Sequence, residues 1–375
     1  MKTAYAVITD ARNHKKMNNC AEEFFERVIS VRLSDDKKAV NIIDQTLLPN
    51  EIKRVDLYTR EELKDAIKKL RVRGAPAIGI AAAYGMAVLS RDLSTDKDDF
   101  FTELKGLKDY LADSRPTAVN LFWALERMEK KAISLKDKSR DEIINGLYEE
   151  AEAIREEDIR ISRNIGEAGF TLLSEIRRKT GRPPGILTHC NAGTLATGKY
   201  GTATAPMYMA LEHGWKGSDM HVYCDETRPL LQGARLTAFE LSEAGIDTTL
   251  QCDNMAASLM AAGKIDIVFV GCDRVAKNGD SANKIGTSSV AINAGYYGIP
   301  FYVCAPGSTI DRSAGSGKDI PIELRSPEEI SESWYEKRMA PENIDIYNPA
   351  FDVTDHSLIT GIITEEGVKK PPYSL

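Results

Sequence analysis

The residue best placed for chemistry is Cys190, which follows the β-branched run ILTHC and leads into the small, polar stretch NAGTLATG. Asn191 and Gly193 let the chain turn tightly, and we expect a helix to begin there with its free N–H groups facing the thiol. A helix N-terminus lowers a thiol pKa, which makes cysteine a usable base or nucleophile. A buried structural cysteine beside a tight turn fits the same pattern, so both interpretations stay open.

The second candidate is Asp273, which follows the apolar run DIVFVGC. Desolvation behind that run can raise the pKa of the carboxyl, as a general acid near neutral pH requires. A polar loop then leads through Asn283 and Lys284 to a helix expected near Gly286, whose first amides would complete an anion site with these two side chains. Asp273 fits a loop-bracing or capping role equally well, and an ion pair with Arg274 would lower its pKa instead.

A third polar cluster, CDETRPLLQGAR, follows the run HVYC and is unusually charged for a connection. Gln232 is its best ligand candidate, because an amide can donate to phosphate. Asp225 and Arg228 fit a structural ion pair that braces the loop as well as they fit a binding role.

Two arginines precede predicted helix starts. Arg73 lies in RVRGAPAIG, and Arg115 lies in SRPTAVNLFWALERM. A phosphate at either place would meet both a guanidinium group and helix amides. Surface arginines without a partner are common, but the Gly-Ala-Pro sequence after Arg73 favours a binding role.

The pattern after Gly185 predicts the strands and helices that position most of these residues. Short β-branched runs alternate with helical segments, which is typical of a βαβα chain with a mostly parallel sheet. Each of the five later cysteines follows or ends one of these runs, at the edge where parallel sheets bind ligands. We expect most of them to pack in the core, since none has metal-ligand spacing. The predicted strands are 186–190, 221–224, 248–252, 266–272 and 300–304.

The first half of the chain has a different pattern. A short strand is expected before Pro49, and the stretch from Thr59 to Lys179 is predominantly helical. The turn-rich segment Lys179–Gly185 is the predicted boundary. We therefore predict an α/β protein with a smaller, mainly helical N-terminal domain carrying a short β segment (1–180) and a Rossmann-like parallel-sheet domain (181–375).

Composition excludes several classes of function. The 375 residues include 49 basic and 56 acidic side chains, a net charge of −7, so no overall positive field exists to bind nucleic acid. The longest uncharged stretch, 285–310, contains two prolines and is not expected to span a membrane. No signal sequence is recognisable, and a cytoplasmic protein is expected. Neither a glycine-rich dinucleotide fingerprint, a Walker pattern nor a C-x-x-C pair occurs.

Six segments together resemble one known family, the methylthioribose-1-phosphate isomerases of methionine salvage. The wider family also contains ribose-1,5-bisphosphate isomerases and non-catalytic regulatory subunits of the eukaryotic translation initiation factor exchange complex. The resemblance runs from about Asp44 to Val368. The segments are RVRGAPAIGIAAAYG, SRPTAVNLFWALERM, THCNAGTLAT, DETRPLLQGARLTAFEL, GCDRVAKNGDSANKIGT and NPAFDVT.

The resemblance implies isomerisation of 5-methylthioribose 1-phosphate to 5-methylthioribulose 1-phosphate, a small sugar phosphate, without a metal or other cofactor. It implies that Cys190 and Asp273 are the catalytic pair and that the protein is a homodimer. Either proton removal from C2 by Cys190 or a hydride shift from C2 to C1 fits these residues. The phosphate-binding residues that the resemblance implies are Arg73, Gly74, Ala75, Arg115, Gln232, Asn283 and Lys284.

The chain departs from the family at its start, where roughly 20 residues precede the usual first strand. The segment at 13–28 has no counterpart in the family and bears on the dimer or on substrate access. Isomerases of 5-deoxyribose 1-phosphate or ribose 1,5-bisphosphate stay as alternatives. A protein that binds a sugar phosphate or nucleotide without turnover is the alternative from another class.

Overall fold

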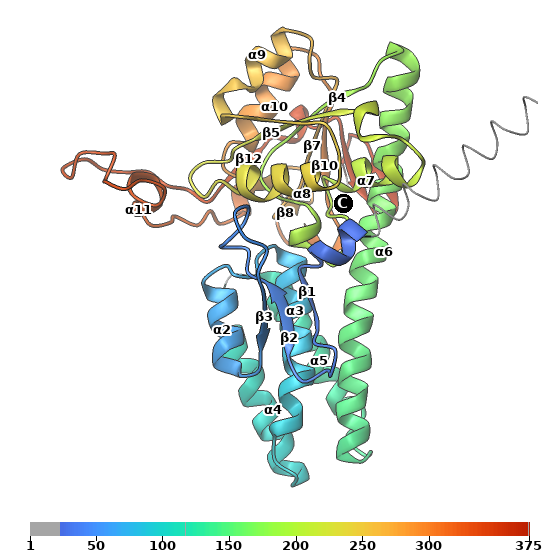
Figure 1. The fold of residues 1–375 in the computed structure, drawn as a ribbon, viewed down its shortest axis with the longest axis vertical. Coiled ribbons are helices and arrows are strands. Elements are labelled where there is room, and N and C mark those ends of the chain that lie inside the picture. The colour runs from blue at the N-terminus through green and yellow to red at the C-terminus, as the bar shows by residue number, and fades with distance from the viewer. Residues whose placement is uncertain (1–22, 117, 374) are drawn as a thin grey trace, which may run out of the picture. The chain divides into compact units, whose positions relative to one another are not determined.

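A computed structural model describes residues 23–116, 118–373 and 375, so most of the extra N-terminal segment lies outside the described residues. The chain divides into two compact units, each considered by itself below. One unit holds Phe25–Arg160 and Thr194–Gly201. The other holds Ile161–Gly193 and Thr202–Leu375. Figure 1 labels the elements of both.

The first unit is a helical bundle with a small antiparallel sheet of order β1-β2-β3. The expected short strand before Pro49 is β2 of this sheet, and the predicted helical stretch forms α2 to α6, the last of which continues into the second unit. The elements are β1 (Val31–Leu33), β2 (Val40–Ile43), β3 (Arg54–Leu57), α2 (Arg60–Lys68), α3 (Ala75–Leu89), α4 (Lys97–Ala112), α5 (Val119–Ser134) and α6 (Arg140–Thr180).

Helix α3 is the centre of this unit. Its sequence is apolar on every side, which is typical of a helix with no solvated face, and all residues from Ala77 to Val88 are buried. Helix α5 lies close to it at Gly79, where a Cβ would come 3.1 Å from the carbonyl oxygen of Asn120. The starts of α3 and α5 are therefore neighbours, which matters because Arg73 and Arg115 precede them.

The second unit contains the predicted parallel sheet, with order β14-β13-β10-β7-β4-β5-β6. All five predicted strands are present, and the α/β fold class is confirmed. The elements are β4 (Gly185–Thr188), α7 (Ala205–Glu212), β5 (His221–Asp225), α8 (Ala238–Glu243), β6 (Thr248–Gln251), α9 (Ala256–Ala261), β7 (Ile267–Val270), α10 (Thr287–Tyr296), β10 (Phe301–Cys304), β13 (Gly361–Thr364) and β14 (Gly367–Lys369).

The central strands of this sheet are buried on both faces, as expected for a parallel sheet between helices. Leu187, Val268 and Val303 belong to one core cluster with the apolar side chains of α9 and α10, so these two helices cover one face. The chain leaves β4 for β5 and β6, then returns to β7 on the other side of β4. Parallel sheets bind ligands at such a reversal, beyond the carboxyl ends of the strands.

A second, smaller sheet of order β11-β8-β9-β12 corrects one prediction. The stretch after Asp273 was expected to be a polar loop, but most of it forms an antiparallel hairpin of β8 and β9. Its turn uses Gly279 at φ +92°, and the Asn278 side chain donates to Asp280 across it. The strands are β8 (Arg274–Ala276), β9 (Ser281–Lys284), β11 (Ile310–Asp311) and β12 (Phe351–Thr354).

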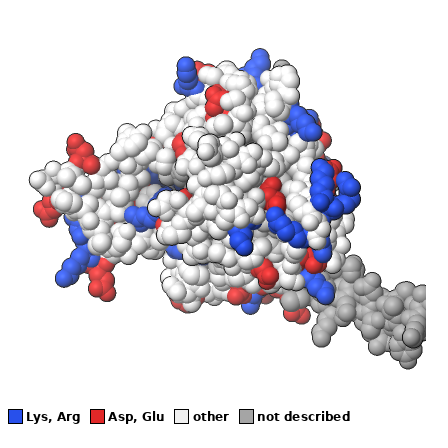
Figure 2. Space-filling view, turned by 90° about the horizontal axis from the view of Figure 1, so that it is seen from above, with Lys and Arg blue, Asp and Glu red and all other residues white. Residues whose placement is uncertain are grey.

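The short helix α11 (Glu328–Ser331) belongs to a segment that extends away from the parallel sheet (Figure 1). Basic and acidic side chains are mixed on the face shown in Figure 2. Among the described residues no helix combines the length and apolar character needed to cross a bilayer. The uncharged stretch 285–310 instead contains α10 and β10.

Candidate active site at the strand ends

Cys190 lies in a sharp turn directly after β4. Its φ of 67° is in the left-handed region, which a non-glycine residue adopts only when the surroundings hold it there. Its N–H donates to Thr227 Oγ1 at 2.9 Å, and its carbonyl accepts from Thr237 Oγ1 at 2.6 Å. With 8% of its surface exposed, the residue is held by backbone bonds on both sides.

Glu240 fixes the next residues of this turn. Asn191 Nδ2 donates to Glu240 Oε1 at 2.5 Å, and Tyr208 OH donates to the other carboxylate oxygen at 3.3 Å. A Cβ at Gly193 would overlap the Glu240 carboxyl group. Glycine is therefore required at 193 because the carboxylate approaches the backbone closely, a reason that the sequence did not reveal.

The helix expected directly after Cys190 is absent. A single 3-10 turn, Thr194–Ala196, follows instead, and α7 begins only at Ala205. Pro206 in the first turn of α7 favours a helix start there, since proline lacks the N–H that an interior position would need. The prediction that a helix N-terminus activates the thiol is therefore wrong.

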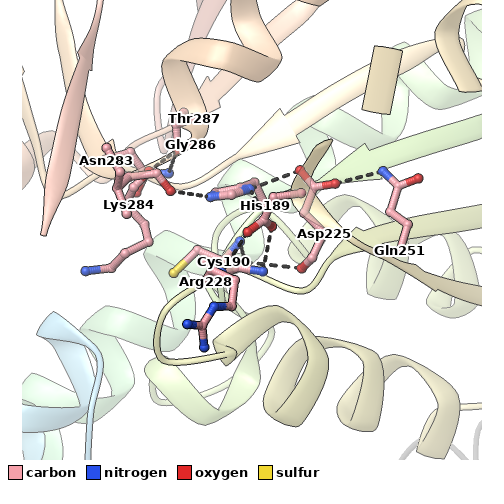
Figure 3. A network of polar contacts seen from close by, with 12 residues as sticks. His189, Cys190, Asp225, Arg228, Gln251, Asn283, Lys284, Gly286 and Thr287 are labelled. Atoms are coloured by element: carbon pink, nitrogen blue, oxygen red, sulfur yellow. Dashed lines mark hydrogen bonds and ion pairs between the residues drawn. The ribbon is translucent and has the colours of Figure 1, made fainter. Parts of the chain in front are cut away.

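His189, the residue before Cys190, is part of a buried polar row (Figure 3). Its Nδ1 lies 3.0 Å from Asp225 Oδ2, and its Nε2 lies 2.8 Å from the carbonyl oxygen of Ile285. Gln251 Nε2 donates to the other oxygen of Asp225 at 2.7 Å. The row thus joins the carboxyl ends of β4, β5 and β6 to the chain just before α10.

The electrostatics of this row favour a proton held between His189 and Asp225. Burial alone would lower the pKa of His189, but the hydrogen bond and charge of Asp225 outweigh burial and raise that pKa to about 9. Burial raises the pKa of Asp225, and its bonds with His189 and Gln251 oppose that rise. Both directions keep one proton between the imidazole and the carboxyl at neutral pH.

The suggested ion pair between Asp225 and Arg228 does not form. The Arg228 guanidinium donates to the carbonyl oxygens of Ile330 and Pro229, at 2.9 and 3.3 Å. Asp225 is used by the histidine row instead, because it ends β5 beside the end of β4. In the view of Figure 3, the Arg228 guanidinium, the Cys190 thiol and the Lys284 ammonium extend to the same side of that row.

Asp273 lies in the short loop after β7, the strand that pairs with β4 on the side away from β5. Gly271 of the same loop packs so closely on Ala192 that a Cβ would lie 2.5 Å from the alanine methyl. The loops carrying Asp273 and Cys190 are therefore in contact. Asp273 itself is exposed, although it follows a buried strand. Its suggested partner Arg274 pairs with Asp311 at 3.1 Å.

Asn283 and Lys284 lie at the end of β9, directly before α10, which starts after Gly286 as predicted. Asn283 Nδ2 donates to Thr287 Oγ1 at 3.0 Å. Lys284 Nζ donates to the carbonyl oxygen of Ala350 at 2.9 Å and lies 4.2 Å from the centre of the Phe351 ring.

The first amides of α10 are not available to an anion in the way predicted. Gly286 N–H donates to one carboxylate oxygen of Asp352 at 2.8 Å, and Ser288 N–H donates to the other at 3.1 Å. Asp352, in the NPAFDVT segment, thus caps the helix from a neighbouring strand. Because a carboxylate already satisfies these two donors, they are not free to bind an anion.

Gln232 is buried, with 6% of its surface exposed, and its Oε1 has no hydrogen-bond partner among the described residues. A buried carbonyl oxygen without a partner costs about 1–3 kcal/mol, and a ligand hydroxyl that donated to it would recover that free energy. This atom therefore suits a hydroxyl of a sugar, whereas the predicted bond to phosphate would have to come from the Nε2 group.

The other predicted phosphate residues belong to the first unit. Gly74 is the N-cap of α3 at φ +91°, with Arg73 before it and Ala75 after it, as predicted. Arg115 lies shortly before α5, and its carbonyl oxygen accepts from the Ala118 N–H at 3.0 Å. The neighbouring Arg71 is structural, since its Nε bonds Asp44 at 2.7 Å.

The remaining described cysteines behave as predicted for packing residues, with one exception. Cys224 and Cys304 are fully buried, and burial raises the pKa of both thiols; burial also raises the pKa of Cys272 to about 12. Cys252 is exposed. Thiols with raised pKa values stay protonated and are poor nucleophiles.

The geometry thus brings Cys190, the Asp273 loop, Gln232, Asn283 and Lys284 into one unit. It also identifies supporting residues that the sequence did not single out for this purpose. Glu240 lies in a helical sequence and Asp352 in a strand-like one. Neither pattern predicts more than an ordinary surface position. The supporting residues are His189, Thr227, Thr237, Glu240, Gln251 and Asp352.

Comparison with known proteins decides the family. The model of the initiation factor 2 subunit family matches residues 71–371. The chain belongs to the initiation factor 2 subunit family. Within it, the methylthioribose-1-phosphate isomerase of Symbiobacterium thermophilum is 58% identical over 350 residues, covering 93% of this chain and 95% of that protein. The resemblance inferred from the motifs is confirmed.

Two further members of the family are informative. The 5-deoxyribose 1-phosphate isomerase of Clostridium botulinum is 52% identical, over 92% of this chain and 96% of that protein. The crystal structure of 5-methylthioribose 1-phosphate isomerase from Pyrococcus horikoshii superposes with a TM-score of 0.86 at 43% identity, covering 94% of this chain and 95% of that one.

Proposed function

We propose that this chain is an aldose–ketose isomerase that converts 5-methylthioribose 1-phosphate to 5-methylthioribulose 1-phosphate in methionine salvage. The observation that carries the proposal is the 58% identity to a methylthioribose-1-phosphate isomerase over nearly the whole of both chains. The contact between the loops of Cys190 and Asp273 supports it, since both catalytic candidates leave neighbouring strands at the sheet reversal.

The phosphate would be bound by cationic and amide donors. From the second unit we assign Gln232, Asn283 and Lys284 to it, because the two amide side chains can donate N–H groups and Lys284 is a cation at the end of β9. From the first unit we assign Arg73, Gly74, Ala75 and Arg115, whose helix starts are adjacent. Planar guanidinium groups suit phosphate because they donate two parallel hydrogen bonds.

The chemistry begins with ring opening. The phosphate on the anomeric oxygen prevents spontaneous opening, so an acid must protonate the ring oxygen as the bond from C1 to that oxygen breaks. We assign this proton to Asp273, which must then be protonated when substrate is bound. Water must be kept from C1 during this step, because its attack there would release phosphate instead.

Hydrogen then moves from C2 to C1, and two routes fit Cys190. As a thiolate it would remove the C2 proton, giving an enol phosphate with a C1–C2 double bond; C1 is then reprotonated while the C2 hydroxyl loses its proton to give the ketone. In the other route hydrogen passes from C2 to C1 with its electron pair, the C2 hydroxyl loses its proton to the Asp273 carboxylate left after ring opening, and Cys190 shapes the site. Thiol chemistry of this kind needs a reduced cysteine, which supports a cytoplasmic location.

Substrate preference provides the first test. We expect kcat/KM to be highest for 5-methylthioribose 1-phosphate among that sugar, 5-deoxyribose 1-phosphate and ribose 1,5-bisphosphate. The Clostridium relative makes 5-deoxyribose 1-phosphate the second candidate. A higher kcat/KM for either competitor would replace the proposed substrate. Binding without product for all three would favour a sensor that does not turn over its ligand.

The route of hydrogen transfer is tested with substrate carrying deuterium at C2. Loss of the label to water would support Cys190 as a base. Complete retention of the label at C1 would favour the hydride shift, and would assign the cysteine a supporting part.

A further inference from the structure

His189 is surrounded by acceptors on both sides of its ring. The residue is 1% exposed and comes from the end of β4, immediately before Cys190. Nδ1 faces the Asp225 carboxyl and Nε2 faces the Ile285 carbonyl oxygen. A carbonyl oxygen only accepts, so Nε2 must carry a hydrogen, and a second proton must lie between Nδ1 and Asp225 for that bond to form.

The ring also sets the position of the chain before α10. Gly286 lies against it so tightly that a Cβ would come within 2.8 Å of His189 Cε1. Asn283 and Lys284 directly precede this contact. A bond at Ile285 and a close contact at Gly286 therefore fix where the end of β9 lies relative to the Cys190 turn.

We propose that His189 is a positioning residue: its ring, bonded to Asp225 on one side and to Ile285 on the other, holds Lys284 and Asn283 in register with Cys190. The inference rests on the isomerase function proposed above. The imidazole does not exchange protons with substrate, because both of its nitrogens already have partners inside the protein. The ring acts by fixing the positions of the Lys284 and Asn283 side chains.

A pH dependence follows from counting protons. When the shared proton is lost, one ring N–H remains for two acceptors, so either the Asp225 bond or the Ile285 bond must break. The pKa of His189 is raised to about 9, so this loss belongs to the alkaline range. Four titratable groups face the ring. Asp225 ends β5, Asp253 lies in the turn after β6, Cys190 lies in the turn after β4, and Asp352 lies in β12.

Two variants separate positioning from a structural contribution. His189→Leu removes both hydrogen bonds, and we expect it to raise KM for the sugar phosphate and lower kcat/KM by about tenfold or more. Asp225→Asn keeps the geometry, since its amide N–H can donate to His189 Nδ1 while its amide oxygen still accepts from Gln251. The proton that the wild-type imidazole and carboxyl share is then absent, so it cannot be lost at high pH. For the wild type we expect KM to rise above pH about 9, where the shared proton is lost. In Asp225→Asn we expect KM to stay constant across this pH range, whatever its value at neutral pH. His221→Gln is the matched control, because that histidine lies at the opposite end of β5 from Asp225 and its Nε2 lies 2.8 Å from Thr249 Oγ1.

Each variant tests the inference independently of the other. Wild-type kinetic constants in His189→Leu would overturn the inference, as would a KM of Asp225→Asn that rises above pH about 9 as it does in the wild type. If His189→Leu does not fold, the profile of Asp225→Asn decides. A far-downfield ring N–H resonance in the unliganded wild-type protein, moved in Asp225→Asn, is expected whether or not the protein is an isomerase. Failure of the wild type on all three sugars would overturn the proposed function, and the absence of that resonance would overturn the inference.

Discussion

At the scale of single residues, Cys190 differs from the other described cysteines in its backbone. It alone among them has a positive φ, and the hydroxyls of Thr227 and Thr237 bond its N–H and carbonyl. Holding a non-glycine residue in this region costs about 1–3 kcal/mol, which the surrounding structure must supply. Such positions cluster at functional sites because the strained turn aims one side chain.

This difference predicts unequal effects of removing a thiol. Cys190→Ser should lower kcat by about 10² or more, because a hydroxyl is a far weaker acid and cannot replace a thiolate. Cys252→Ser is the matched control: it also follows a strand of the same sheet, but it is exposed, and its kcat should stay within about twofold of wild type. Steady-state assays of both variants measure this, and equal rates for the two would remove Cys190 from the mechanism.

At the scale of elements, the start of α3 depends on one glycine. Gly74 has φ +91°, and a Cβ there would lie 2.5 Å from the backbone of Ala196, in the loop that follows the Cys190 turn. The same loop is held by Gln45, which donates to the Leu195 carbonyl oxygen at 2.8 Å, and by Asp158, which accepts from the Gly198 N–H at 2.6 Å. The start of α3 therefore packs directly on this loop, and a change at Gly74 would displace one or the other.

Gly74→Ala should accordingly destabilise the protein by about 2–4 kcal/mol and lower kcat/KM, because it adds both backbone strain and a clash at the proposed phosphate site. Gly245→Ala is the control, since that glycine has φ +75° and no atom near its missing Cβ. It should cost about 1–2 kcal/mol from backbone strain and leave kcat/KM unchanged. Denaturant unfolding and steady-state kinetics give both quantities; identical losses in the two variants would contradict the packing argument.

The β8–β9 hairpin depends on a buried carboxylate. Asp280 accepts from Asn278, from the Gly317 N–H, and from the N–H and Nδ1 of His356. Burial alone would raise its pKa, but these bonds outweigh burial and lower the pKa to about 2. A pKa lower in the folded than in the unfolded state gives stability that is complete above pH about 4 and is lost as pH falls toward 2.

Asp280→Asn should therefore lower the free energy of unfolding by about 2 kcal/mol at neutral pH. The difference from wild type should shrink between pH about 4 and about 2, where the wild-type carboxylate becomes protonated. Urea unfolding at several pH values measures it. A difference that stays constant down to pH 2 would mean that the charge of Asp280 contributes nothing.

The elements were largely predictable, and the exceptions have physical causes. Five parallel strands and the start of α10 follow from β-branched runs and glycine, which are local signals. The β8–β9 hairpin was missed because its residues are polar, and its stability comes from Asp280 bonding to segments distant in sequence. The missing helix after Cys190 has the same origin, since Gln45 and Asp158 hold that loop in a form that no local pattern specifies.

The sequence identified candidate site residues but not their environment. Positions at strand ends and helix starts identified Cys190, Asp273 and Arg73 as candidates. The sequence could not show that Asp352 occupies the first amides of α10, or that Asp273 is exposed, because both depend on which strands are neighbours. Roles within the site therefore need kinetics on variants.

At the scale of the whole molecule, the resemblance to the isomerases predicts a homodimer. We expect light scattering after size exclusion to give twice the chain mass of 41.4 kDa. Oligomers of this kind are usually closed and symmetric, so the mass should not increase with concentration. A mass equal to one chain at micromolar concentration would contradict the prediction.

The central claim is tested most directly by following 5-methylthioribose 1-phosphate with phosphorus and carbon NMR in the presence of the purified protein. We predict conversion to the ketose 1-phosphate with the phosphate ester intact, and loss of that conversion in both Cys190→Ser and Asp273→Asn. Release of inorganic phosphate, or an unchanged sugar at enzyme concentrations equal to substrate, would contradict the account.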